Sequence, residues 1–351
     1  MFWLVVVTLT CSLASLLIWL GPVREAAAPI AASSPSPPAV APAPPAGQAV
    51  PLLPHPPPVD RHPMPVADIS ARGRALARPD AALLEPAPHI PGGFLPRIAR
   101  DGRTPMQVYA AGFDAQDHRP RVAILIAGVG MNVAESAAAV EKLPGAVSLA
   151  VSPYANRLDD LLDHARNAGH ELLISLPMEP AGYPLNDPGH HALLTGASMS
   201  ENAQRLEWAI TRFSGFVGAT GALGTLRGER FAASLGQMAS LFDTLAERGL
   251  LYVDPRPNAR LIGGARQSAI AYRGVDLVVD DVAANGAGAE AIDAALARLE
   301  KLAQGRGAAI GLVSQPSPLV VDRLGVWAVG LAERGLALAP VSAVVQMPQA
   351  P

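Results

Sequence analysis

Asp254 and Arg256 are the strongest candidates in this sequence for a reactive pair. An acid and a cation two residues apart follow a short apolar run. A carboxylate there can act as a general acid or base, and a guanidinium can bind an anion. Glu179 follows another apolar run and is the second candidate acid. We predict Asp254 and Glu179 as catalytic groups, with a structural ion pair as the alternative for Asp254 and a cap on the turn at Gly182 as the alternative for Glu179.

Four further side chains could bind a substrate. Arg256 and Arg227 could hold an anionic sugar or a phosphate, and Tyr154 and Tyr183 could stack on sugar rings. The plainer interpretation of Arg227 is a solvated surface residue.

Histidines are poorly placed to hold a metal ion. From residue 118 onward they are His118, His164, His170, His190 and His191. Hydrolysis at a metal needs about three protein ligands and a water. The only set that could hold an ion is the adjacent pair His190 and His191 with a carboxylate. We predict no metal ligands and no cofactor, and the single cysteine, Cys11, lies in the N-terminal apolar run.

The segments that must position these residues alternate between apolar runs and amphipathic stretches. Strands are predicted at 122–127, 147–151, 171–176, 216–219, 250–254, 277–279, 309–313 and 336–340. Helices are predicted at 132–143, 156–168, 200–213, 234–248, 289–304 and 320–334. Strand–helix alternation predicts a parallel sheet with helical crossovers, and continuous apolar strands fit burial on both faces. The number of units favours a distorted barrel, whose site lies at the carboxyl ends of the strands.

The N-terminal part has a different character. Residues 2–23 carry no charged side chain. As a helix this run is about 33 Å long, enough to cross a hydrocarbon core of about 30 Å. We predict a membrane anchor at 1–25, with a cleaved signal peptide as the alternative.

Residues 26–88 are rich in alanine and proline, as in Ser34 to Pro38. Such a segment buries too little apolar surface to fold, so we predict a disordered, extended linker. A protein that binds proline-rich segments could be its partner. The net charge of −3 gives no basic field for nucleic acid.

Several segments resemble the divergent polysaccharide deacetylase family. They are 95–99, 122–130, 143–154, 168–180 with its phrase Leu-Pro-Met-Glu-Pro, 215–218 with Gly224, and 248–254. The resemblance covers about residues 88–345, and we place the domain at 89–347. It implies an α/β fold, a distorted (β/α) barrel of the polysaccharide deacetylase or glycoside hydrolase type. It further implies hydrolysis of an amide bond on an N-acetylated glycan, zinc as the metal of related enzymes, and a place in the bacterial envelope.

The departures from the family pattern concern the metal site. Family members commonly carry an Asp-Asp pair where this chain has Ala127 and Gly128. They commonly carry histidine at the positions of Ser175, Ala222 and Gln315. The resemblance therefore implies a degenerate metal site.

Two functions remain open: amide hydrolysis in carbohydrate metabolism, and a catalytically inactive barrel that binds envelope glycan, such as a peptidoglycan-like polymer, or a protein partner. Metal-free hydrolysis with Asp254 and Glu179 as an acid–base pair is a third hypothesis. The expected location is the bacterial inner membrane, with the globular domain in the periplasm.

Overall fold

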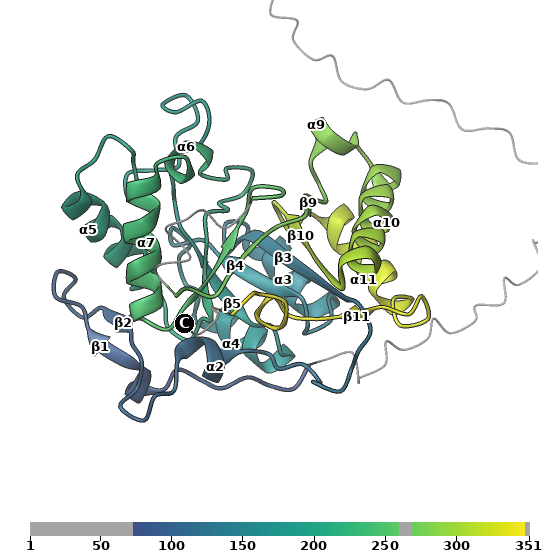
Figure 1. Cartoon of the computed structure of the whole chain (residues 1–351), viewed down its shortest axis with the longest axis horizontal. Coiled ribbons are helices and arrows are strands. Elements are labelled where there is room, and N and C mark those ends of the chain that lie inside the picture. The colour runs from purple at the N-terminus through teal and green to yellow at the C-terminus, as the bar shows by residue number, and fades with distance from the viewer. Residues whose placement is uncertain (1–72, 260–268, 348–351) are drawn as a thin grey trace, which may run out of the picture. The chain divides into compact units, whose positions relative to one another are not determined.

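A computed structural model describes residues 73–259 and 269–347 (Figure 1). The predicted anchor at 1–25, and the predicted linker up to residue 72, lie outside the described residues. Within residues 73–259 and 269–347, no helix has the length and apolar character needed to cross a membrane.

Parallel strands form the centre of the domain, in the order β8-β7-β6-β5-β4-β3-β10-β9. Every pairing along this path is parallel. The bounds are β3 (Arg121–Val129), β4 (Ser148–Val151), β5 (Leu172–Ser175), β6 (Gly218–Thr220), β7 (Leu251–Asp254), β8 (Tyr272–Gly274), β9 (Leu277–Val278) and β10 (Ala308–Val313). A short strand, β11 (Ala337–Leu338), pairs with the first residues of β3, before β4 takes up the pairing.

The two edge strands of this sheet, β8 and β9, are joined by only Val275 and Asp276. The Val275 N–H donates to the Asp254 carbonyl of β7, and the Asp276 N–H donates to the Ile310 carbonyl of β10. One bent segment therefore links both edges and curls the sheet. This arrangement confirms the predicted α/β class and fits a distorted (β/α) barrel.

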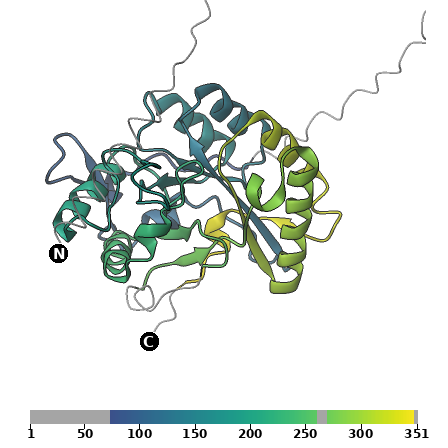
Figure 2. The same cartoon turned by 90° about the horizontal axis from the view of Figure 1, so that it is seen from above.

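Helices surround the strands. They are α3 (Val133–Lys142), α4 (Asp159–Ala168), α5 (Met199–Ile210), α7 (Leu235–Glu247), α10 (Ala289–Arg306) and α11 (Pro318–Val329), with shorter α2 (Pro105–Tyr109), α6 (Glu229–Ala232) and α9 (Val282–Asn285). In Figures 1 and 2, α5 and α7 lie on one side of the strands, and α10 and α11 on the other. Local sequence sets their ends: Ser198 and Glu201 form a capping box at the start of α5, and Gly169 ends α4 with φ +90°.

Two hydrophobic clusters divide the side chains of the central strands β3, β4, β5 and β10. In β3, Ala123, Leu125 and Ala127 belong to the cluster inside the curled sheet, whereas Ile124 and Ile126 pack with the helices. Alternate side chains of a strand point to opposite faces, so both faces are buried. This is why the strands read as continuous apolar runs in the sequence.

All eight predicted strands and all six predicted helices have a counterpart, with ends shifted by a few residues. The sequence did not predict β8, because its three residues, Tyr272, Arg273 and Gly274, form no apolar run.

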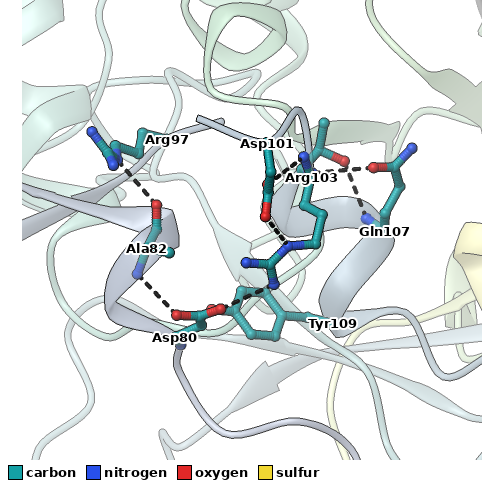
Figure 3. Close-up of polar contacts among 8 residues, drawn as sticks. Asp80, Ala82, Arg97, Asp101, Arg103, Gln107 and Tyr109 are labelled. Carbon is teal, nitrogen blue, oxygen red and sulfur yellow. Dashed lines mark hydrogen bonds and ion pairs between the residues drawn. The ribbon is translucent and has the colours of Figure 1, made fainter. Parts of the chain in front are cut away.

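The N-terminal part of the domain is a small hairpin: β1 (Leu84–Pro86) pairs antiparallel with β2 (Phe94–Pro96), after a 3₁₀ turn at Ala81–Leu83. The Asp80 carboxylate accepts hydrogen bonds from the Ala82 N–H at 2.9 Å and from Arg103 Nη1 at 3.0 Å (Figure 3). The Asp80 N–H donates to the Tyr109 hydroxyl at 2.9 Å. Leu83 is fully buried. The boundary predicted at residue 88 is therefore too late, because Asp80 and Leu83 already pack onto the domain.

Candidate functional site

A cavity of about 780 Å³ lies at the carboxyl ends of β3, β6 and β10. Its volume falls within the ~300–1,000 Å³ common for small-molecule sites. This end of a parallel barrel is where binding loops gather. We name it the mouth cavity; it is lined by Gly128, Met131, Asn132, Glu135, Tyr154, Asn186, Asp187, Pro188, Gly189, His190, Leu223, Gly224, Thr225, Leu226, Gln315 and Pro316.

Tyr154 is held against one wall of the mouth cavity. Its hydroxyl oxygen accepts a hydrogen bond from the His191 N–H at 3.3 Å. Gly189 packs so closely that a Cβ there would lie 2.6 Å from the same oxygen, and its φ is +100°, so glycine is required. Burial raises the pKa of the Tyr154 phenol, and the nearby Asp187 carboxylate also raises it. The hydroxyl therefore stays neutral and keeps its proton available for a ligand.

An aromatic group continues outward from Tyr154. The His191 ring stacks on Trp208 with ring centres 3.7 Å apart, and Arg212 lies over the Trp208 ring. Burial lowers the pKa of His191, and so do the charges of His190, Arg205 and Arg212. The His191 ring therefore packs on Trp208 and is not part of the cavity lining. Of the two adjacent histidines, only His190 lines the mouth cavity.

The bottom of the mouth contains the positions that carry metal ligands in the family pattern. A register shift occurs in β3 between Ile126 and Val129, and Gly128 within it has φ +69°. A Cβ at Gly128 would lie 3.1 Å from the Ser314 carbonyl oxygen and 3.6 Å from Cγ of Gln315. The Gln315 side chain also reaches Gly224, where a Cβ would lie 3.6 Å from its Nε2. The neutral amide of Gln315 therefore lies next to both glycines on the wall of the mouth cavity.

The remaining family positions are also without metal-binding groups. Ala127, Ala222 and Ser175 are fully buried, and the Ser175 hydroxyl has no hydrogen-bond partner among the described residues. In the part of the chain that the structure describes, no three His, Cys, Asp or Glu side chains are placed to hold a metal ion together. These residues do not fit the zinc that the family resemblance implies.

Asp254 lies at the end of β7 but on the side of Tyr252, which packs toward α7 and Tyr272. Its carboxylate accepts hydrogen bonds from Arg256 Nε at 2.9 Å and Nη2 at 2.6 Å, and from the Tyr272 hydroxyl at 3.0 Å. The bond to Asp254 raises the pKa of Arg256, and burial together with Asp254 raises that of Tyr272. Asp254 is only 1% exposed and is not among the residues that line the mouth cavity.

Glu179 is similarly enclosed. Its Oε2 accepts hydrogen bonds from the N–H and the hydroxyl of Thr195, both at 2.6 Å, and its Oε1 lies 3.0 Å from Arg230 Nε. Its backbone carbonyl accepts the N–H groups of Arg230 and Phe231, at the start of α6. Glu179 therefore joins the loop after β5 to the loop after β6. It does not line the mouth cavity either.

The other predicted residues also lie outside the mouth cavity. Arg227 pairs with Asp281 at 3.0 Å, and Asp281 caps α9. Tyr183 lies half-buried in the turn after Glu179. Of the predicted site residues, only Tyr154 lines the mouth cavity.

Two carboxylates that no sequence pattern identified, Glu135 and Asp187, do line the mouth cavity. Glu135 lies in the first turn of α3, directly after β3. A helix that starts where a barrel strand ends places its first turn at the mouth, and this signal could have identified Glu135. Asp187 lies in an irregular loop, and no pattern marks it.

This chain is similar to a known protein family and to a solved structure. The sequence pattern described as "Divergent polysaccharide deacetylase" matches residues 124–345. The chain belongs to the divergent polysaccharide deacetylase family. A crystal structure of an uncharacterized protein from Agrobacterium tumefaciens C58 is similar, with 30% sequence identity and a TM-score of 0.67. The match covers 72% of this chain and 100% of that one. No curated protein matches the chain significantly.

Membership confirms the resemblance found in segments such as 122–130 and 168–180. The similar crystal structure, at 30% identity, shows that this resemblance includes the fold of the domain.

Proposed function

We propose that this divergent polysaccharide deacetylase family protein binds envelope glycan in its mouth cavity and does not hydrolyse it through a metal ion. The observation that carries the proposal is the place of the Gln315 side chain, 3.6 Å from where a Cβ would stand on each of Gly128 and Gly224. Three strand ends that hold ligands in the family pattern meet there, and none presents a metal-binding group.

A sugar fits the remaining lining. Tyr154 offers an aromatic face and a neutral hydroxyl, and Asn132, Asn186 and Gln315 offer amides. Aromatic rings pack on the apolar faces of sugars, and amides bond to sugar hydroxyl groups as donors and acceptors.

Amide hydrolysis on an N-acetylated glycan, the activity implied by the family, is the competing candidate. Asp254 and Glu179 are the acids that metal-free hydrolysis would use, but each is enclosed by hydrogen bonds within the fold. A general acid or base must reach the proton that it transfers. The enclosed positions of both acids therefore favour glycan binding over amide hydrolysis.

The place of action is proposed from the sequence. The apolar run at 2–23 and the proline-rich stretch that follows it support a domain held at the bacterial inner membrane and facing periplasmic glycan. In this setting the protein would serve carbohydrate metabolism by holding glycan.

The test uses the full-length chain with N-acetylated chitotetraose, in one sample with excess zinc and in another with EDTA. Binding is measured by calorimetry, acetate release by an enzymatic assay, and bound zinc by elemental analysis after dialysis. We expect equal binding in both samples, no acetate release above a protein-free control, and no stoichiometric zinc. Zinc-dependent acetate release would contradict the proposal and restore hydrolysis as the function.

A further inference from the structure

The mouth cavity has an uneven distribution of charge. Its lining includes two carboxylates, Glu135 and Asp187, and no lysine or arginine is among the described residues that line it. Asp187 Oδ1 accepts the Gly189 N–H at 2.8 Å. Neither carboxylate forms an ion pair within the described part of the chain.

Arginines near the lining residues do not themselves line the mouth cavity. Arg227, next to Leu226, pairs with Asp281 at 3.0 Å. Arg205 donates to the Ala192 carbonyl, and Arg212 donates to the Pro153 carbonyl and lies over Trp208. His190 is the one titratable base on the wall itself.

These surroundings define the ligand that the mouth would take. An N-acetylated sugar carries a neutral amide, for which carboxylates offer no charge complement. A sugar whose nitrogen is a free amine carries an ammonium group, which bonds strongly to carboxylates. An acidic sugar would be repelled by Glu135 and Asp187.

From the cavity and its charges we infer that the mouth binds a glycan bearing free amino groups, that is, sugar units from which the N-acetyl group is already removed. This inference rests on the proposed function, since it names the ligand class of the same cavity. Tyr154 packs on a sugar ring, and Glu135 and Asp187 pair with the ammonium group. In a reaction sequence, this protein would then act after a separate enzyme that hydrolyses the N-acetyl amide, and it would bind the deacetylated product.

The test compares three tetrasaccharides on the full-length chain: the glucosamine tetramer, N-acetylated chitotetraose and cellotetraose. Dissociation constants are measured by calorimetry at low salt, at a pH where the sugar amine is protonated. We expect the glucosamine tetramer to bind at least about fivefold more tightly than either neutral tetramer, since each partly exposed ion pair adds modestly. Salt should reduce this ratio.

The double substitution Glu135→Gln with Asp187→Asn should bring the ratio toward one. The matched control, Glu141→Gln with Asp160→Asn, removes two carboxylates that line the separate groove between α3 and α4, and should leave the ratio unchanged. Equal binding of all three sugars, or an unchanged ratio in the first variant, would overturn the inference and leave glycan binding standing. If none of the three tetrasaccharides bound, both this inference and the proposed glycan binding would be overturned.

Discussion

Cγ of Gln315, after β10, lies 3.6 Å from the point where a Cβ on Gly128 of β3 would stand. The two residues come from neighbouring strands of the sheet. Gly128 has φ +69°, in the left-handed region that favours glycine. The Gln315 side chain thus lies beside a glycine, at a position where the family pattern has an acid.

Gly128→Ala should destabilise the domain by about 1–2 kcal/mol, because an L-residue is strained at this φ and its Cβ would crowd the Ser314 carbonyl. The measurement is the free energy of unfolding in urea. The control is Gly305→Ala, in α10 with nothing within 4 Å of the new Cβ, which should stabilise by about 0.5–1 kcal/mol. Equal effects of the two changes would show that Gly128 is not constrained.

Asp254→Ala should lower the free energy of unfolding by about 2–3 kcal/mol, because it leaves Arg256 and the Tyr272 hydroxyl without their partner. The comparison is Asp322→Ala, which removes an exposed ion pair with Lys142 and should cost about 0–1 kcal/mol. Binding of glycan should be retained by both folded variants. If Asp254→Ala abolished binding without loss of stability, Asp254 would belong to the site.

His170→Gln should flatten the dependence of stability on pH. His170 is fully buried, with Nδ1 2.8 Å from the Val147 carbonyl oxygen, and burial lowers its pKa. A histidine with a lowered folded-state pKa binds its proton more readily when unfolded. Its contribution is therefore complete above the ordinary pKa of about 6.5 and is lost as the pH falls through the lowered value.

The measurement for His170 is urea unfolding at about pH 7.5 and about pH 5.5, with a difference of up to about 1.4 kcal/mol per pH unit in the natural protein. His170→Gln should show a smaller difference than the natural protein. Parallel pH profiles for the two proteins would contradict this account.

Tyr154→Ala should weaken glycan binding about tenfold, because it removes the aromatic face of the mouth cavity. Tyr154→Phe keeps the ring and should retain most of the affinity. The control is Tyr183→Ala, at a tyrosine that does not line the cavity. The dissociation constants are measured by calorimetry with N-acetylated chitotetraose. An equal loss of affinity in the two alanine variants would argue against Tyr154 as the binding surface.

The class of fold and the family could both be predicted from the sequence. Both faces of most strands are buried, so every strand except β8 reads as an apolar run, and Gly169 and Gly249 follow the ends of α4 and α7 just before the next strand. These are local signals that survive without tertiary contacts. The losses at Ala127, Gly128 and Ser175 were also readable from the sequence.

The side chains that reach the mouth could not be predicted in the same way, because they depend on how distant segments pack together. Asp254 ends β7, and strand alternation turns its side chain toward Tyr252 and away from the mouth. Glu179 lies in the loop after β5, where Thr195 and Arg230 enclose its carboxylate. Glu135 and Asp187 line the cavity because a helix start and a loop converge there from distant parts of the chain. Convergence of this kind depends on how the sheet curls, and no local pattern encodes it.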